Sequence, residues 1–469
     1  MPVPENSRCL VDYFRCPPEF VPLEVSSKLS GTPGYFRFGD EAVCFGRVAG
    51  EAPPRSPSAA PSLRDAAAQL RVEDGTVALP FDPGEVARNL RLENYTATRG
   101  SGSSSMTGRL YYMVRPLLPV RARRHLQKLR LRNWDQLPFP HWPVDFSVDA
   151  LMESLLLAVS RASGRPIPFI WFWPEGHSAC VLMTHDVEEA AGRDFCSTLM
   201  DLDAAYGFRA SFQVVPEKRY EVTPEFLDEI RSRGFEVDVH DLNHDGHLYR
   251  ERSEFLRRAE KINEYGRRFE AEGFRAGVLY RNQEWFDSLD FSYEMSVPNV
   301  AHLDPQRGGC CTVMPYFIGK MVEIPVTCVQ DYTLFNIFGA FSIDLWREQT
   351  RLILNRHGLM SFIVHPDYVI APRNREVFES LLAHLRSLVK EEGVWSAIPR
   401  EVNRWWRERS AMQLVERNGA WRIEGRGSER ARIAWASEQN GRLTLTVEGA
   451  DGDSEGWTEP VVNARRVSG

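Results

Sequence analysis

The chain has 469 residues, 43% hydrophobic and 26% charged, a composition that is typical of a globular protein and predicts two to four domains. Its net charge of −7 gives no general attraction to nucleic acid, so we expect no nucleic-acid partner. No uncharged apolar run approaches the roughly 18–20 residues that cross a bilayer, so we expect no transmembrane segment. The eight cysteines form no CxxC pair and the first residues lack a secretory pattern, which favours a cytoplasmic protein.

The first third of the sequence predicts a small unit followed by a basic connector. Residues 1–105 alternate short apolar runs with turns, including a hairpin around Gly39-Asp40, and predict an N-terminal α+β region. Residues 51–62 and 97–108 have loop compositions. Residues 106–165 predict a helical connector, in which 114–134 contain seven Lys and Arg residues. We interpret that stretch as a solvated helix face rather than a pyrophosphate or membrane site.

Residues 166–400 change to an alternation of strands and helices. Seven apolar, β-branched runs recur: SACVLMTHD, RASFQVVP, FEVDVH, GFRAGVLY, FSYEMSV, MVEIPVT and LMSFIVHP. Helix-like segments separate most of them, for example TPEFLDEIRSRG, with Thr223 as the expected N-cap. This pattern predicts an α/β fold with a parallel seven-stranded (β/α) barrel. Residues 401–469 contain further short strand patterns and predict a small β-rich C-terminal appendage.

Polar residues gather where the predicted strands end. Active sites of parallel α/β barrels lie at the carboxyl ends of the strands, because the loops converge there. The residues that follow or finish these strands are Asp186 and Glu188, His240 and His244, Arg275, Asp331, and His365. We therefore expect these seven side chains to form one site.

Two spacings within this set indicate a metal centre. Asp186 and Glu188 are two positions apart, so an extended backbone projects both carboxylates to the same side. His240 and His244 are four apart, which brings two imidazoles together on a helical turn or in a tight loop. Two histidines and one carboxylate are a common set for a divalent metal such as Zn²⁺. The residues leave open which carboxylate is the third ligand, and a lone His247 is expected to be a bystander.

The order and spacing of these motifs resemble the polysaccharide deacetylase family (carbohydrate esterase family four, the chitooligosaccharide-deacetylase homology domain) over about 170–395. Thr184-His-Asp186-Val is similar to its Thr-Phe-Asp-Asp motif, which would make Asp186 the catalytic base. His240 and His244 match its His-x-x-x-His motif, and Met360-Ser-Phe-Ile-Val-His365 resembles the strand that ends in the general acid. Asp186-Val-Glu188 is similar to an Asp-x-Asp variant, with Glu188 as the metal ligand.

The other two family motifs match only in part. Arg275-Ala-Gly-Val-Leu-Tyr280 lacks the proline of Arg-x-Pro-Tyr, although Arg275 would still orient the base. The motif that carries an Asp and a Trp has no clean match, and Asp331 is the candidate acid in its place. The phrases LNHDG, GGCC and IVHPDY resemble an uncharacterised bacterial subgroup of the family.

The resemblance implies a distorted barrel and a Zn²⁺-dependent hydrolase that removes acetyl groups from an amino sugar or polysaccharide. In that reading Glu188, His240 and His244 hold the metal, and Asp186, Arg275, Asp331 and His365 are catalytic. Two alternatives remain open: a hydrolase of a cyclic amide or another non-sugar C–N bond, and a catalytically silent carbohydrate-binding or assembly protein. The oligomeric state is not indicated by the sequence.

Overall fold

The fold is known from a computed structural model, which describes residues 4–26, 28–58, 60–96 and 133–448. The expected loop at 97–108 and most of the basic stretch at 114–134 lie outside the described residues. The described part of the connector contains helix α5 (Ser147–Ser163), which ends at Gly164 in the left-handed conformation. Among the described residues, no helix combines the length and apolar character that a membrane span requires.

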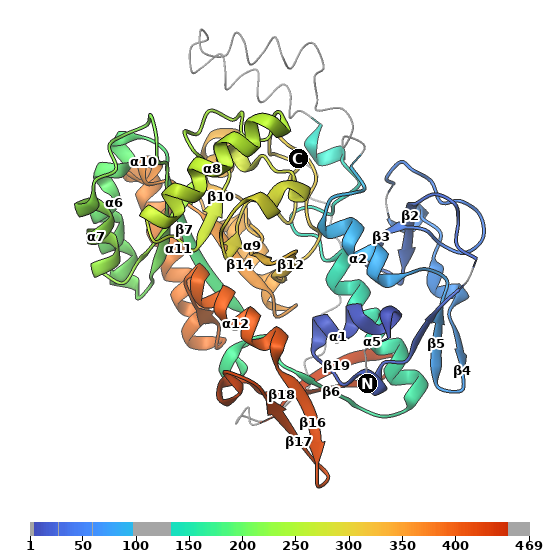
Figure 1. Ribbon diagram of the computed structural model, residues 1–469. Helices are drawn as coiled ribbons and strands as arrows, with labels where there is room; N and C mark the ends of the chain where they lie inside the picture. The colour runs from blue at the N-terminus through green and yellow to red at the C-terminus, as the bar shows by residue number, and fades with distance from the viewer. Residues whose placement is uncertain (1–3, 27, 59, 97–132, 449–469) are drawn as a thin grey trace.

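A curled, mainly parallel sheet forms the centre of a mixed α/β fold (Figure 1). Its strands lie in the order β12-β13-β11-β10-β9-β8-β7-β14, with β15 also paired to β7. Only β12 runs antiparallel to its neighbour, β13. The strands are β7 (Cys180–Val187), β8 (Ala210–Val214), β9 (Glu236–His240), β10 (Gly273–Arg275), β11 (Tyr293–Glu294), β12 (Tyr316–Ile318), β13 (Met321–Glu323), β14 (Leu359–Ile363) and β15 (Trp395–Ser396). Six of the seven apolar runs named above contain one of these strands, and the run SACVLMTHD contains all of β7 except its last residue.

The two sides of this sheet approach each other through the segment that follows β13. The backbone N–H of Cys328 donates to the carbonyl of Ser361 at 3.1 Å. The hydroxyl of Thr327 donates to the carbonyl of Leu359 at 2.6 Å and accepts from the N–H of Ser361 at 2.9 Å. The hydroxyl of Thr327 thus takes the place of a backbone group between this segment and β14. The sheet curls here without a continuous ladder of backbone hydrogen bonds.

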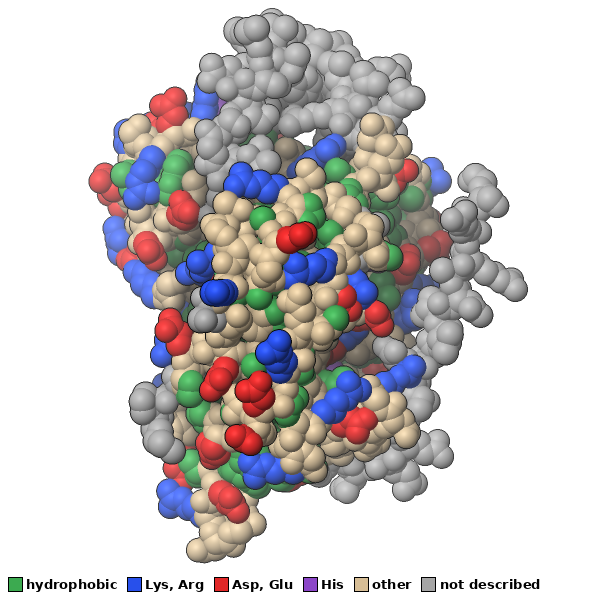
Figure 2. All heavy atoms as spheres, turned by 90° about the vertical axis from the view of Figure 1, so that its right-hand side faces the viewer, with side chains coloured by type: hydrophobic (Ala, Val, Ile, Leu, Met, Phe, Trp, Pro, Cys, Tyr) green, Lys and Arg blue, Asp and Glu red, His purple; other side chains and the backbone are tan. Residues whose placement is uncertain are grey.

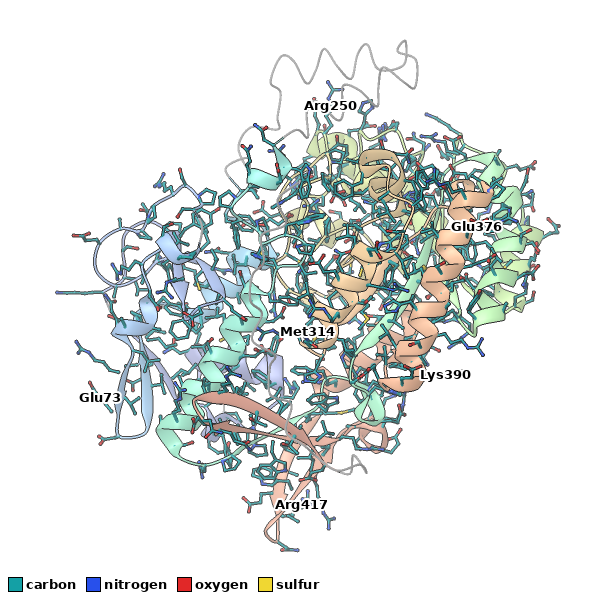
Figure 3. All side chains as sticks on the ribbon, turned by 180° about the vertical axis from the view of Figure 1, so that it is seen from behind. Glu73, Arg250, Met314, Glu376, Lys390 and Arg417 are labelled. Carbon is teal, nitrogen blue, oxygen red and sulfur yellow. The ribbon has the colours of Figure 1, made fainter. Side chains whose placement is uncertain are left out.

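Helices follow most of the parallel strands and bury apolar faces against the sheet. The Thr223 hydroxyl accepts from the N–H of Phe226 at 3.3 Å and caps α7, as predicted. Gly207, with φ at 85°, ends α6, because its position in the left-handed region favours a residue without a Cβ. The helices are α6 (Ala190–Tyr206), α7 (Pro224–Ser232), α8 (Arg252–Arg268), α9 (Asp344–Leu354), α10 (Pro366–Val369), α11 (Pro372–Glu391) and α12 (Pro399–Ala411). Glu376 and Lys390 lie near the two ends of α11 in Figure 3.

The N-terminal residues fold beside the curled sheet. The expected hairpin around Gly39-Asp40 is present as β2 paired with β3, and β1, β5 and β4 form a second small sheet. Acidic and basic side chains are interspersed on the face of the molecule shown in Figure 2. The elements are α1 (Arg8–Phe14), β1 (Leu23–Val25), β2 (Gly34–Phe38), β3 (Ala42–Gly46), β4 (Arg71–Glu73), β5 (Thr76–Leu79) and α2 (Pro83–Arg91).

The C-terminal strands pair with each other and with an earlier segment. Strand β18 (Ile433–Gln439) lies between β19 (Arg442–Val447) and β6 (Ile167–Ile170), which comes just before the central sheet in the chain. The hairpin of β16 (Gln413–Arg417) and β17 (Ala420–Glu424) projects from the body, with Arg417 near its tip in Figure 3. One buried core joins α1, α5, β6 and β18, and a second fills the space between the sheet and helices α6 to α11. The division into four regions expected from the sequence, with its three boundaries, stays a prediction.

Candidate metal and catalytic site

The seven predicted site residues lie together at the carboxyl ends of the parallel strands. Asp186 is near the end of β7, His240 is the last residue of β9, and Arg275 is the last residue of β10. Glu188 directly follows β7, and His365 lies two positions beyond β14. Because the strands are parallel, these ends meet at one edge of the sheet.

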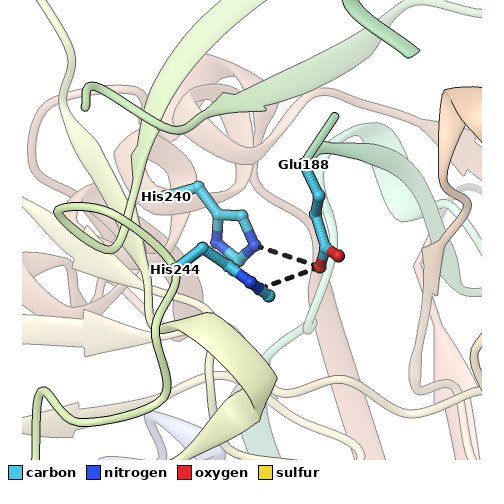
Figure 4. A group of neighbouring side chains, drawn as sticks. All are labelled: Glu188, His240 and His244. Carbon is cyan, nitrogen blue, oxygen red and sulfur yellow. Dashed lines mark ion pairs between the residues drawn. The ribbon is translucent and has the colours of Figure 1, made fainter. Parts of the chain in front are cut away.

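The Glu188 carboxylate is the centre of this group. Its Oε1 lies 2.9 Å from Nε2 of His244 and 3.6 Å from Nε2 of His240. Figure 4 marks these two ion pairs with dashed lines. The same oxygen lies 3.4 Å from Nε2 of His365. Burial raises the pKa of Glu188, but His244 and His365 outweigh it and hold that pKa well below its usual range. Three imidazoles therefore point their Nε2 atoms at one ionised carboxylate.

The donor atoms of this group fit a divalent metal. The Nε2 atoms of His240 and His244 are buried and have no partner in hydrogen-bond geometry among the described residues. His240 is 1% exposed, and its Nδ1 lies 3.1 Å from the carbonyl oxygen of Arg275, a contact that requires a proton on Nδ1. That proton leaves the lone pair on Nε2 free to bind a cation. Glu188, His240 and His244 have ligand atoms that all lie within 4.8 Å of one another.

The surroundings of His244 differ from those of His240. Arg219 donates from Nη2 to the His244 carbonyl at 2.7 Å, and the same nitrogen lies 3.3 Å from the ring Nδ1. Burial lowers the pKa of His244, but the Glu188 carboxylate outweighs it and the net shift is upward. Metal binding to His244 therefore competes with a proton on the ring.

The second carboxylate, Asp186, is held by a buried arginine. Nη1 of Arg275 lies 2.5 Å from Oδ1 of Asp186 and 2.7 Å from the Thr184 hydroxyl, and its Nε donates to the Met295 carbonyl at 2.9 Å. Arg275 is completely buried. Burial raises the pKa of Asp186, but Arg275 and His240 outweigh it and lower that pKa. The other oxygen, Oδ2, lies 3.7 Å from Nε2 of His240 and so faces the ligand group.

His365 and Asp331 form a hydrogen-bonded pair beside Glu188. Nδ1 of His365 lies 2.6 Å from Oδ1 of Asp331, and the His365 backbone N–H donates to Oδ2 at 2.8 Å. Asp331 is completely buried and His365 is 4% exposed. Burial lowers the pKa of His365, but Asp331 and Glu188 outweigh it and raise that pKa well above its usual range. The imidazole therefore holds a proton that it can donate.

His247 stands apart from this group. Its side chain is 47% exposed, and its Nδ1 lies 3.7 Å from Asp245. His240 and His244 are the pair that faces Glu188. Cys310 and Cys311, which follow Gly308 and Gly309 in the chain, are buried free thiols and do not belong to this group.

Two features near the site lie outside the sequence prediction. A cavity is lined by segments that follow β10, β11 and β13, among them Leu279, Val326 and Gln330, and by Trp142, but by none of the seven site residues. Trp142 comes from the segment before α5 rather than from a strand end. Gly277 is the second feature: a Cβ there would lie 2.9 Å from Cδ2 and 3.3 Å from Nε2 of His244. The glycine in the Arg275–Tyr280 segment was the only sequence signal of that close approach.

No family model matches the chain, and no curated protein matches it. Solved structures do match. A putative polysaccharide deacetylase from Mycobacterium smegmatis has 17% identity and a TM-score of 0.42, over 51% of this chain and 93% of its own. A probable polysaccharide deacetylase from Pseudomonas aeruginosa PAO1 has 12% identity and a TM-score of 0.40, over 50% and 92%. The chain is similar to solved polysaccharide deacetylases. It is also similar to Puue allantoinase, with 13% identity and a TM-score of 0.41, over 50% and 92%.

Proposed function

We propose that the protein is a metal-dependent hydrolase that removes acetyl groups from an N-acetylated sugar or polysaccharide. The observation that carries the proposal is the single oxygen of Glu188 that faces the Nε2 atoms of His240, His244 and His365 at 2.9–3.6 Å. Close to it lie the two groups that amide hydrolysis needs, the Asp186 carboxylate and the His365 imidazole.

Glu188, His240 and His244 are the residues that would hold the metal, for which we propose Zn²⁺. Imidazole nitrogen and carboxylate oxygen are ligands that zinc prefers, and three protein ligands leave a position for water or substrate. A bound zinc ion polarises a carbonyl and lowers the pKa of water to about 7.

Asp186 is the proposed base. Its Oδ1 is occupied by Arg275, and its Oδ2 faces the ligand group, so one oxygen stays available to accept the proton of the attacking water. Arg275 also holds the carboxylate in one orientation, because its guanidinium is itself fixed by Thr184 and Met295.

His365 is the proposed general acid. Departure of an amine from a tetrahedral intermediate requires a proton on the leaving nitrogen. Asp331 accepts from Nδ1 of His365, which fixes the ring with Nε2 toward Glu188 and stabilises its protonated form. The proton on Nε2 can then pass to the departing amine.

A screen of purified protein tests this function. The first measurement is metal content by plasma mass spectrometry, for which we expect about one zinc, cobalt or nickel ion per chain. The second is acetate release from N-acetylated oligosaccharides, with Asp186→Asn as the inactive control. Protein without metal and without a difference from Asp186→Asn contradicts the proposal. Metal-loaded protein that cleaves cyclic ureides and spares acetylated sugars supports the alternative hydrolase instead.

A further inference from the structure

Glu93, from the N-terminal residues, is buried in loops of the curled sheet. It lies two residues beyond the end of α2, has a left-handed φ of 58°, and is 5% exposed. Its Oε2 accepts from Nε of Arg281 at 2.8 Å, and its Oε1 pairs with Nη2 of the same guanidinium. The backbone N–H of Gly309 donates to Oε1 at 2.7 Å, and Gln283 donates to Oε2 at 3.3 Å. The carboxylate therefore has partners on both oxygens.

Arg281 links Glu93 to the backbone of the loop that follows β10. Its Nη1 donates to the carbonyl of Leu279 at 2.9 Å. Its own backbone N–H and carbonyl are both bonded by the side-chain amide of Gln306, at 3.0 and 3.1 Å. The guanidinium is completely buried with the carboxylate, and such a bidentate pair fixes orientation as well as distance.

Two residues of this loop have a backbone conformation that is unfavourable for their side chains. Val278 and Leu279 both have left-handed φ values, 62° and 52°, which non-glycine side chains disfavour. Such conformations persist where surrounding contacts impose them, and they cluster at functional sites. The bond from Arg281 to the Leu279 carbonyl is one of the contacts that impose this one.

The same loop is in close contact with the candidate ligand His244. A Cβ on Gly277 would lie 2.5 Å from Oδ2 of Asp241 and 2.9 Å from Cδ2 of His244, so the loop backbone is in close contact with both residues. Asp241 and His244 also have left-handed φ values, 57° and 52°. Two strained loops therefore support each other, and one of them holds the imidazole that faces Glu188.

We propose that Glu93 and Arg281 are a positioning pair for the metal site, so that the N-terminal residues complete the site rather than form an attached module. The inference rests on the proposed function, because it takes His244 as a metal ligand. The pair acts through the loop: Glu93 fixes Arg281, Arg281 fixes Leu279, and the loop backbone at Gly277 limits the position of the His244 ring.

Zinc affinity is the measurement that separates positioning from a purely structural role. We would compare the wild type with Glu93→Gln, Arg281→Lys and the double variant Glu93→Gln/Arg281→Gln, by competition with a chromophoric chelator. The double variant removes both charges of the pair, so neither Glu93 nor Arg281 is left as a buried charge without the other, and it stays informative if a single variant fails to fold. The control is Glu153→Gln/Arg356→Gln. It removes the ion pair of Arg356 with Glu153 of α5 and also the pair of Arg356 with Glu41. Arg356 lies just before β14, at the far end of that strand from His365.

We expect the double variant to be folded by circular dichroism and to bind zinc roughly 10- to 100-fold more weakly than the wild type, the usual effect of losing support behind a ligand. Arg281→Lys keeps the positive charge but loses the bidentate contact of the guanidinium with Glu93, so its zinc affinity should lie between those of the wild type and the double variant. The cobalt-substituted double variant should also show altered visible absorption bands, because the ligand geometry changes.

Zinc affinity of the folded double variant within about twofold of the control overturns the inference and leaves the proposed function standing, provided the wild type binds zinc and releases acetate. A wild type that binds no metal overturns both. An equal loss in the control variant also overturns the inference, because the effect would then be a general consequence of removing an ion pair.

Discussion

Nδ1 of His365 lies 2.6 Å from Oδ1 of Asp331, and the backbone N–H of the same histidine donates to the second oxygen of that carboxylate at 2.8 Å. Both bonds come from one residue, so the carboxylate fixes the ring and its backbone together. Nε2 of His365 then points to Oε1 of Glu188 at 3.4 Å. The pair therefore orients a protonated imidazole toward the ligand group.

The first prediction concerns this pair. His365→Ala should lower kcat for deacetylation by about 10²- to 10⁴-fold, the usual contribution of a general acid, and should leave about one zinc ion bound. Asp331→Asn should cause a smaller loss, since the ring keeps its proton but loses its charged partner. Steady-state kinetics and metal analysis of both variants provide the check. Loss of zinc in His365→Ala would identify the histidine as a ligand instead.

The second prediction separates two histidines that are three positions apart. His244→Ala should weaken zinc binding by at least about 100-fold, because it removes one of three protein ligands. His247→Ala is the matched control: its side chain is 47% exposed and contacts Asp245 rather than Glu188, so its zinc affinity should equal that of the wild type. Chelator competition measures both affinities. Equal affinities in the two variants would contradict the ligand assignment.

The third prediction concerns the buried charge of Arg275. Arg275→Met should lower the free energy of unfolding by about 3–5 kcal/mol, because Asp186 is left as an uncompensated buried carboxylate. Urea denaturation followed by fluorescence measures the difference. Arg193→Met serves as the control, since its partner Asp194 is 69% exposed and the pair contributes about 0–1 kcal/mol. The same small effect in both variants would show that Arg275 does not stabilise Asp186.

The fourth prediction is a dependence of stability on pH. Burial raises the pKa of Asp304 to about 6, Arg281 opposes that shift and Glu93 adds to it. The native state thus binds this proton more tightly than the unfolded chain, so the contribution of Asp304 to the unfolding free energy falls as pH rises from about 4 to 6 and is constant above that. The unfolding free energy of Asp304→Asn should equal that of the wild type near pH 4 and should exceed it by about 1–3 kcal/mol at pH 7–8.

Denaturation curves at several pH values check the Asp304 prediction. The exposed residue Asp228 provides a control for the loss of any carboxylate, as Asp228→Asn. If the difference between wild type and Asp304→Asn does not change between pH 4 and 8, the carboxyl does not hold its proton more tightly in the native state.

Much of the central sheet and of the site could be predicted from the sequence, because both depend on local patterns. Apolar β-branched runs indicate strands wherever the sheet is buried on both faces. The residues that finish these runs meet at one edge through parallel topology alone, which is why His240, Glu188 and His365 converge as expected. The roles assigned to them stay predictions.

Contacts between distant segments could not be predicted in this way. Strand β6 pairs with β18, although the two are separated by more than half of the chain, and β15 pairs with β7. An apolar run indicates that a segment can form a strand, but it does not indicate which distant strand is its partner. The Glu93–Arg281 pair joins residues 188 positions apart. Ordinary charged residues in two loops have no pattern that indicates a partner, so this anchor is visible only in three dimensions.

The Gly-Gly-Cys-Cys segment shows the same limit. Both of its cysteines, Cys310 and Cys311, are buried. The reason for its glycines was not visible in the sequence: a Cβ on Gly308 would lie 2.4 Å from Oε1 of Glu93, and one on Gly309 would lie 2.1 Å from the Asn299 carbonyl oxygen. Close approach of two distant segments, rather than a local turn alone, requires these residues.

Zinc titration of metal-stripped protein, with acetate release as the readout, tests whether the Glu188 group is a catalytic metal site. We expect no acetate from an N-acetylated oligosaccharide before zinc is added, a linear rise in rate up to about one equivalent, and no rise at any zinc concentration in Glu188→Gln. Full activity in the stripped protein, or the same titration curve in Glu188→Gln, would contradict it.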